Sequence, residues 1–577
     1  MWNLLKFGEC EGADAVRIQQ ERKPRSAQFL LSSVLTHQFL LSSANAIRRG
    51  VARSGVGASH PPSPWNTDGM VTFDSGATES GNPDAIVVGA GPNGLAAAVT
   101  LARAGLSVTV FERNATIGGG ARTAELTLPG FLHDICSAVH PMALASPFFR
   151  EFGLADRISL VVPEISYAHP LDDARGRRNA AGVAWHDLAR TVDALGVDGK
   201  AWGRLLGPLV EHADAVTDFT ANQLLRFPRD PLTVARFGLR VLEQGSPLWG
   251  LRFRGDEAPA LLSGAMAHAM TRMPRPAGAA AGLLLATQAH VRGWPIPLGG
   301  SQAIVDALAQ DFLRHGGVIQ TGAMVSSLAE LPRARAVLFD VTPRALAELA
   351  GDALPAGYAR SLRRFRYGNA AAKVDFALDG PVPWANPELA GAGTVHLGGT
   401  RAQLARAEAE VASGRHAEHP FVLVSQPSVV DPGRAPTGKQ VLWAYSHVPA
   451  GSKRDPVEDV TREIERFAPG FRDVVLAALS KPATGGVATS GSAGSLESYN
   501  PNYVGGDIGS GAVSVRQMLA RPVLSTNPWR TPLSGVYLAS ASTPPGPGVH
   551  GLGGWHAATR ALAEVFGLPQ PSLAVGD

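Results

Sequence analysis

The chain has 577 residues, enough for two or three domains, and its 45% hydrophobic and 18% charged residues are typical of a globular protein. Its formal charge is +3, from 52 Lys and Arg and 49 Asp and Glu. The first 70 residues hold eight Lys and Arg and five Asp and Glu, which leaves 44 residues of each sign in the rest of the chain, here called the body. This balance argues against nucleic acid binding by the body.

Two further classes of protein are disfavoured by composition. The two cysteines, Cys10 and Cys136, form no Cys-x-x-Cys pair, so thiol–disulfide chemistry is not expected and a reducing compartment is favoured. No Cys and His cluster has metal-ligand spacing, and we expect no metal site. No apolar run reaches about 18 residues, so a transmembrane helix is not expected. The longest apolar candidate, 277–289, predicts a buried helix instead.

Residues 1–80 differ from the rest of the chain. They repeat Gln28–Ser33 at Gln38–Ser43 and end in a segment rich in proline. The mixture of Ser, Arg and apolar residues fits a transit peptide, but several acidic residues weaken that interpretation. The alternative is a disordered extension, or a start assigned too early, with Met70 as the true start. We therefore expect a cytoplasmic protein, with peripheral membrane contact left open, and a mitochondrial one only if the extension is a transit peptide.

A β-α-β unit begins at Asp84. Ala85–Val88 is a short apolar run typical of a strand buried on both faces. After the loop Gly89–Gly94, residues 95–104 are rich in Ala and Leu and predict a helix that ends at a glycine. A second strand, 107–111, leads to Glu112.

This unit predicts a dinucleotide site. In the G-x-G-x-x-G pattern, Gly89 makes the turn, Gly91 admits a pyrophosphate and Gly94 allows close helix packing. The helix N-terminus supplies free N–H groups for the phosphates, and Glu112 can accept hydrogen bonds from ribose hydroxyls. The adjacent arginine leaves some affinity for a 2′-phosphate open. The expected contact residues are Gly89, Gly91, Pro92, Asn93, Gly94, Glu112 and Arg113.

A second glycine cluster favours FAD over NAD. Gly118, Gly119 and Gly120 let the chain pass close to the cofactor phosphates, and Arg122 can pair with a phosphate or remain an ordinary surface arginine. No second G-x-G-x-x-G follows a strand, so we expect no separate NAD(P)H domain.

The remaining elements alternate in type. Residues 185–290 are mostly helical, with helices expected at 202–225 and 258–270. A helix at 304–313 and strands at 318–321 and 336–339 follow. Further strands are expected at 372–378, 421–425 and 440–445, then an amphipathic helix at 457–467, a strand at 536–539 and a helix from about residue 555.

The alternation predicts an α/β protein in which a Rossmann-type FAD-binding domain is interleaved with an α+β substrate domain. The FAD-binding domain is expected to comprise residues 84–165, 290–345 and 500–570. The substrate domain is expected to comprise 166–289 and 346–499.

From Asp84 to Leu568 the chain resembles phytoene dehydrogenase-like oxidoreductases of the FAD-dependent amine oxidase and phytoene desaturase superfamily. This family includes the group named pyridine nucleotide-disulfide oxidoreductase domain-containing protein 2. The disulfide chemistry in that name has no support here, because no redox cysteine pair exists. Besides the glycine loops, the resemblance is carried by 129–131, 293–295, 297–302, 505–507, Arg521-Pro522 and 537–554.

The resemblance implies further cofactor contacts. The backbone at Val325 would contact the adenine side. The loop 542–554, with Gly548, Val549 and Gly553, would pass the ribityl chain and the flavin ring. A helix N-terminus there would stabilise the negative charge of reduced flavin. Related flavoproteins often carry Arg directly after the glycine pair, where this chain has Gly120, so Arg122 would have to replace it.

The chemistry would belong to the flavin, with hydride accepted at N5 and little need for acid–base help. His140, His550 and His556 are candidates for polar contacts near the ring, each with a structural or capping role as the alternative. Trp555 would wall the flavin or pack in the core. We assign no role to the other histidines in stretches that resemble the family, among them His268.

We therefore expect an FAD-dependent oxidoreductase acting on a lipophilic, isoprenoid or carotenoid-like substrate, with oxygen or a quinone as acceptor. One alternative is a flavin amine oxidase, which usually needs an aromatic cage and a lysine near N5; no aromatic pair adjoins the glycine-rich loop. Another is a flavin-bearing regulatory protein with little turnover. A narrow polar cavity would favour amines, a long apolar one isoprenoids, and a closed one the regulatory protein.

Overall fold

The structure is a computed structural model that describes residues 81–172, 179–485 and 494–576. The predicted N-terminal extension, 1–80, therefore lies outside the described residues, as does Cys10. Within those ranges Cys136 is a free cysteine. No helix of these described ranges is both long and apolar enough to cross a bilayer.

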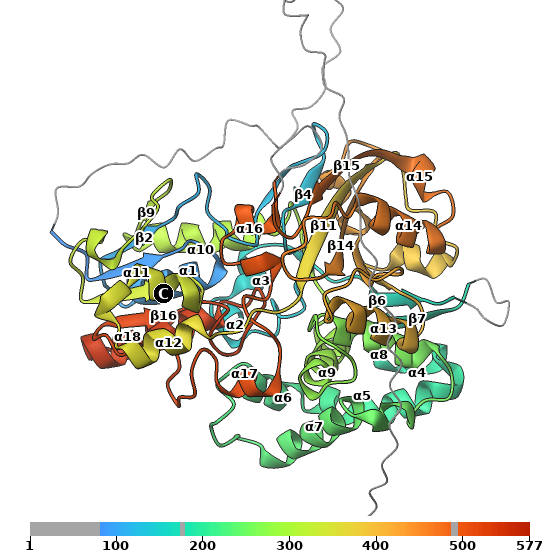
Figure 1. The fold of residues 1–577 in the computed structure, drawn as a ribbon, viewed down its shortest axis with the longest axis horizontal. Coiled ribbons are helices and arrows are strands. Elements are labelled where there is room, and N and C mark those ends of the chain that lie inside the picture. Colours follow the sequence, from blue (N-terminus) through green and yellow to red (C-terminus); the bar gives the residue numbers. More distant parts are fainter. Residues whose placement is uncertain (1–80, 173–178, 486–493, 577) are drawn as a thin grey trace, which may run out of the picture. The chain divides into compact units, whose positions relative to one another are not determined.

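A five-stranded parallel sheet holds the predicted β-α-β unit (Figure 1). Its strand order is β16 (Val536–Leu538), β10 (Ala336–Phe339), β1 (Ala85–Val88), β2 (Val108–Phe111) and β9 (Val318–Gln320). One face packs against α1 (Pro92–Arg103), α10 (Gln302–Arg314) and α18 (Leu552–Ala561). The other packs against α11 (Pro343–Leu349) and α12 (Ala356–Arg363). Burial on both faces explains the unbroken apolar runs of β1 and β10.

A second sheet has seven strands and is mostly antiparallel. Its order is β15 (Val475–Lys481), β11 (Ala370–Leu378), β14 (Gln440–Val448), β13 (Val422–Ser425), β12 (Thr394–Leu397), β6 (Ile165–Pro170) and β7 (Ala181–Trp185). The amphipathic helix α14 (Val457–Phe467) buries Val460, Ile464 and Phe467 against one face. The other face meets the helical region.

The helical region follows β7 and lies below the second sheet in Figure 1. It comprises α4 (Leu188–Ala194), α5 (Gly199–Glu211), α6 (Ala213–Thr220), α7 (Pro231–Gln244), α8 (Glu257–Ala267) and α9 (Pro276–Val291). The shorter elements used below are α16 (Leu496–Tyr499) and α17 (Val515–Leu519). The remaining helices and strands are α2 (Pro147–Glu151), α3 (Leu154–Arg157), α13 (Arg401–Val411), α15 (Phe471–Val474), β3 (Thr123–Glu125), β4 (Leu132–Asp134), β5 (Leu160–Val161) and β8 (Ile296–Pro297).

The predicted α/β class is confirmed. All strands of the five-stranded sheet lie in the segments expected for the FAD-binding domain, and those of the seven-stranded sheet, apart from Ile165, in the segments expected for the substrate domain. The single helix expected at 202–225 is wrong: α5 ends at Glu211 and α6 at Thr220. Pro208 inside α5 removes one backbone donor shortly before that break.

The crossing of α1 and α18 fixes how the two ends of the chain meet. A Cβ atom on Gly554 would lie 1.7 Å from the carbonyl oxygen of Asn93, and one on Gly94 would lie 1.9 Å from that of Gly89. Real side chains cannot occupy either position: at Gly554 the backbone of α18 touches that of α1, and at Gly94 the helix α1 touches the loop that follows β1.

Gly554→Ala should therefore lower the free energy of unfolding by about 2 kcal/mol or more, because the methyl group forces the helices apart. The matched control is Gly207→Ala on α5, where a Cβ would meet no atom within 4 Å. That change should stabilise the protein by about 0.5–1 kcal/mol. Denaturant unfolding of both variants measures the difference, and equal stabilities would contradict the close crossing.

Candidate active site

A cavity of about 950 Å³ joins the two sheets. At one end it is lined by the loops that leave β1, β2 and β10 at their carboxyl ends, which is where open parallel sheets bind ligands. At the other end it is lined by helices α6, α7 and α9 and by strands β13 and β14. We call these the dinucleotide half and the substrate half.

The first glycine loop forms one wall of the dinucleotide half, through Gly89, Gly91, Pro92 and Asn93. Gly91 is the N-cap of α1, and no side chain caps this helix end. A Cβ atom on Gly91 would lie 2.9 Å from an oxygen of Asp340. The helix N-terminus is therefore presented to the cavity as bare backbone, the arrangement that favours phosphate binding.

Glu112 lines the same half with a fixed carboxylate. One oxygen accepts the N–H of Ala90 at 2.9 Å, and the other accepts the backbone and side-chain N–H groups of Asn114 at 2.9 and 2.8 Å. Each carboxylate oxygen has two lone pairs, so the oxygen bonded to Ala90 keeps one, to which a ribose hydroxyl can donate. Arg113 and Val325 also line this end.

The second glycine loop touches the first. Gly119 has a φ of +54°, and a Cβ there would lie 3.0 Å from the Cα of Gly91. A Cβ on Gly120 would lie 2.1 Å from the hydroxyl of Tyr503. Tyr503 therefore occupies the space into which a larger residue at 120 would extend, which gives a physical reason for glycine where related flavoproteins carry arginine.

Arg122 lies behind this loop, outside the cavity lining. Its guanidinium donates to the carbonyl of Gly119 and the hydroxyl of Thr116, and stacks over the ring of Tyr499. One buried Nη has no partner among the described residues. Arg122 thus supports the loop from below, and its pairing with a phosphate stays a prediction.

Asp340 is a site residue that the sequence patterns did not reveal. It follows β10 directly, lines the cavity, and accepts the N–H of Gly94 at 3.0 Å. Burial raises the pKa of its carboxyl to about 7, and the nearby Glu112 adds to the rise. An uncharged carboxyl can lie beside a phosphate without repelling it.

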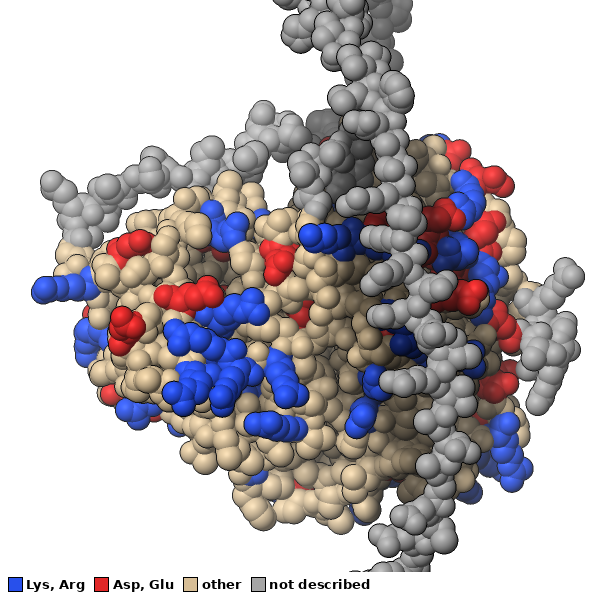
Figure 2. Space-filling model, viewed as in Figure 1, with Lys and Arg blue, Asp and Glu red and all other residues tan. Residues whose placement is uncertain are grey.

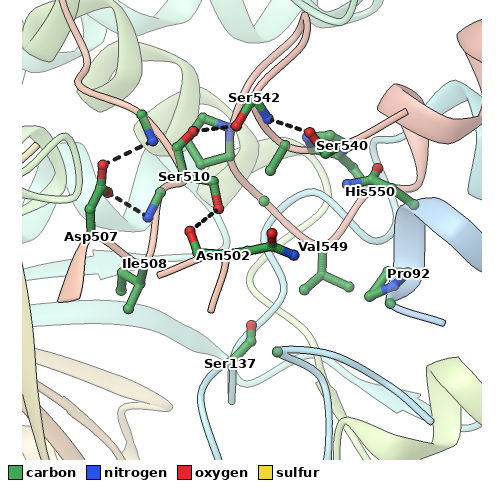
Figure 3. Close-up of a pocket in the computed structure, with 18 of the residues that line it drawn as sticks. Pro92, Ser137, Asn502, Asp507, Ile508, Ser510, Ser540, Ser542, Val549 and His550 are labelled. Carbon is green, nitrogen blue, oxygen red and sulfur yellow. Dashed lines mark hydrogen bonds between the residues drawn. The ribbon is translucent and has the colours of Figure 1, made fainter. Parts of the chain in front are cut away.

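The C-terminal loop, 540–550, forms the opposite wall (Figure 3). The hydroxyl of Ser542 donates to the carbonyl of Ser510 at 2.7 Å. The buried Arg521 donates to the carbonyls of Ala541 and Gly509. These bonds hold the loop over the cavity, with Gly548 and Val549 in its lining. The other predicted contact residues, Gly94, Gly118 and Gly553, lie outside the lining.

Two of the three predicted histidines reach the cavity. The ring of His140 pairs with the hydroxyl of Ser301 at 2.8 Å. The ring of His550 is used by its own loop, since one nitrogen accepts the N–H of Leu552 and the other faces the carbonyl of Gly546. Burial lowers both pKa values to about 4, so neither imidazole is charged at neutral pH.

His556 and Trp555 lie outside the lining, in positions that fit the structural alternative expected for each from the sequence. His556 faces the carbonyl of Ala221 at 3.0 Å and packs on Trp529. Trp555 packs beside Phe148 in the core. His556 therefore faces the segment after α6, whereas Trp555 faces the core of the five-stranded sheet.

The substrate half is mainly apolar. Its helical side presents Phe219, Leu224, Phe237, Val241, Leu284 and Leu285. Its other side presents Trp294 and, from the second sheet, Leu423, Trp443 and Tyr445. Such a lining suits a hydrocarbon ligand.

One imidazole pair interrupts this apolar lining. His268, which lines the cavity, places Nε2 2.9 Å from Nε2 of the buried His396. Burial lowers the pKa of His268 to about 3, so the ring is neutral. The other ring nitrogen of His396 has no partner among the described residues. Leaving a donor unpaired costs more than leaving a lone pair, so the favoured tautomer has His396 donate from Nε2, and His268 then carries its own N–H on Nδ1.

Comparisons with known proteins agree with this geometry. A family model described as NAD(P)-binding Rossmann-like domain matches residues 87–152. A rat protein, pyridine nucleotide-disulfide oxidoreductase domain-containing protein 2, is 26% identical over 88% of this chain and 98% of its own length. Phytoene dehydrogenase of Streptomyces griseus is 28% identical over 69% and 78%. A redesigned putrescine oxidase has the same fold, with a TM-score of 0.52 and 17% identity over 84% of this chain and 99% of that structure.

The predicted resemblance is therefore confirmed, and the chain is an oxidoreductase with a dinucleotide-binding domain. The glycine cradle and the fixed carboxylate of Glu112 fit such a cofactor. Among the residues that the structure describes, no group of three acidic, cysteine or histidine side chains is placed to hold a metal ion.

Asp340 leads to a prediction about pH. A carboxyl whose pKa is raised to about 7 loses its neutral form as the pH rises through that value, and the anion then repels a pyrophosphate. The dissociation constant for a dinucleotide, with FAD as the probe, should rise above pH 7 by up to about tenfold per pH unit. In Asp340→Asn, whose amide oxygen can still accept the N–H of Gly94, the dissociation constant should not change with pH.

Titration of the apoprotein with FAD between pH 6 and 9 measures this. The exposed Asp352→Asn is the matched control and should behave as the wild type does. A flat wild-type profile would contradict the assignment.

Proposed function

We propose that this chain, an oxidoreductase of the amine oxidase and phytoene desaturase type, binds FAD and transfers a hydride between the flavin and a lipophilic substrate. The observation that carries the proposal is the continuity of the cavity. One end has the glycine loops and Glu112, and the other is lined by apolar side chains. Both reactants can therefore be held in one continuous cavity.

FAD is favoured because the cradle has two glycine loops and a third wall. The N-terminus of α1 would hold the pyrophosphate, Glu112 a ribose, and the 540–550 loop the flavin end. When bound, FAD supplies the hydride acceptor. The hydrogen bonds that Ser542 donates to Ser510 and that Arg521 donates to Ala541 fix the loop in advance, so little ordering is needed when the cofactor arrives.

An isoprenoid or carotenoid-like substrate is favoured by the substrate half. Its aliphatic side chains from α7 and α9 exclude water and orient a hydrocarbon by contact alone. The N–H of His268 offers one hydrogen bond, which suits a substrate with a single oxygen atom. The electron acceptor would be oxygen, which is small, or a quinone, which could enter by the same apolar route.

An amine oxidase is the second candidate, because the cavity lining contains more aromatic rings than the sequence suggested. Trp443 and Tyr445 lie edge to face with ring centres 5.2 Å apart, and Tyr503 also lines the cavity. Such rings can bind an ammonium group. Against this candidate, the lining residue Asp507 already accepts the N–H groups of Gly368 and Gly511. Its carboxyl group therefore has fewer free lone pairs for an ammonium group.

The cofactor assignment predicts that Gly91→Val abolishes FAD binding. The side chain would meet Asp340 and fill the approach to the pyrophosphate. Gly105→Asn at the end of α1, where a Cβ meets nothing within 4 Å and where asparagine tolerates the left-handed φ of +82°, is the control. Flavin absorbance after loading with FAD reports the result. A yellow, active Gly91→Val variant would refute the site.

The substrate assignment is tested by anaerobic bleaching of the flavin with carotenoids, retinoids, fatty alcohols and amines. Lipophilic isoprenoids should bleach it, and amines should not; the reverse would favour the second candidate. Ala281→Phe on α9 should raise the half-saturating concentration about tenfold by filling the substrate half, without changing flavin content. Ala356→Phe on the exposed side of α12 should change neither.

A further inference from the structure

Helix α7 is apolar on its outer side as well as its inner side. Phe237 and Val241 line the cavity, whereas Leu232, Leu239 and Leu242 are 60%, 67% and 59% exposed. Positions seven and three residues apart share one face of a helix, so these three leucines form one outward stripe. Phe227, in the segment before the helix, is 84% exposed. Exposed apolar side chains this close together indicate a contact surface.

This apolar surface reaches the mouth of the cavity. Val515 and Leu519 of α17 line the cavity and are 51% and 37% exposed, so they stand at an opening. The side chain of Gln223 donates to the carbonyl of Ser525 at 3.1 Å, which ties the segment before α7 to the segment after α17. We call this surface the apolar rim: Phe227, Leu232, Leu239, Leu242, Val515 and Leu519.

A group of arginines borders the rim. Figure 2 shows Lys and Arg side chains gathered over α12 and beside α17, with few charged side chains on the surface over α7. Gln517 of α17 donates to the carbonyl of Arg366 at 2.8 Å, which joins the two regions. We call these exposed residues the basic patch: Arg344, Arg360, Arg363, Arg364, Arg366 and Arg516. None forms an ion pair with a carboxylate of the described residues.

We propose that the apolar rim and the basic patch dock the protein on a bilayer of anionic lipids, with the mouth of the cavity against the lipid. The proposal rests on the proposed function in one respect, because a lipophilic substrate would then pass from the bilayer into the cavity without crossing water. Leucine side chains would enter the interface between headgroups and acyl chains, and the arginines would contact the lipid phosphates.

The charges favour a bilayer over a second copy of the chain. In a symmetric dimer through this face, two basic patches without acidic partners would approach each other across a shared interface. Their repulsion would oppose the gain from burying the leucines. An anionic lipid surface instead offers both an apolar layer and the opposite charge in a single partner.

Flotation of the full-length flavoprotein with vesicles tests this. Wild type should bind vesicles of phosphatidylcholine and phosphatidylglycerol, bind phosphatidylcholine alone more weakly, and lose affinity as salt is added. The combined variant Leu232→Gln, Leu239→Gln and Leu242→Gln should lower the partition coefficient about tenfold or more. Arg360→Gln, Arg363→Gln and Arg364→Gln together should remove the preference for phosphatidylglycerol.

The matched control replaces three exposed apolar residues elsewhere, Val318→Gln, Leu476→Gln and Val575→Gln, and should bind as wild type does. Failure of wild type to bind either vesicle, or equal binding by the leucine variant, would overturn the proposal. The proposal would also be overturned if wild type sediments as a dimer and the leucine variant as a monomer, because the apolar rim would then join two copies of this chain. Flavin absorbance in every sample tests the proposed cofactor separately, because flotation requires neither flavin nor turnover.

Discussion

The close backbone contact around the N-terminus of α1 is the constraint on which the rest of the structure depends. Gly91 lies against Gly119, and Asn93 lies against Gly554 of α18. Three parts of the chain thus meet where glycines at 91, 119 and 554 let their backbones approach closely. These contacts do not cover the N-terminal end of α1 itself, and that end lines the cavity.

That contact also brings together residues far apart in sequence. The 540–550 loop and the first glycine loop lie on facing walls, although more than 400 residues separate them. The loop depends in turn on Arg521, whose burial lowers its pKa to about 10 while its donors remain bound to carbonyls of the loops at 509–510 and 541. A buried cation held by carbonyl groups is costly to rearrange, which favours a preformed site.

The sequence was sufficient where the signal is local. The apolar runs of β1 and β10 and the amphipathic pattern of α14 predict these elements to within a residue or two, because burial of one or both faces repeats at a fixed period. Strands β6, β7, β12 and β15 were not predicted. Their partners are distant in sequence, and their pairing, not their composition, makes them strands. Asp340 and the His268–His396 pair were not assigned for the same reason: each depends on a neighbour that only the fold supplies.

The two halves of the cavity have opposite electrostatic requirements: one must bind an anionic cofactor, and the other an uncharged, apolar molecule. The dinucleotide half must accept an anion, yet two of its nearest side chains are acids, Glu112 and Asp340. Glu112 is fixed as a hydrogen-bonded carboxylate that suits a ribose hydroxyl, and the pKa of Asp340 is raised to about 7, so both acids would be compatible with a phosphate-bearing cofactor. In the substrate half, burial keeps His268 neutral, so no charge opposes the entry of an apolar molecule. The low polarity of the cavity would strengthen hydrogen bonds to a cofactor, and it would also favour a lipophilic substrate.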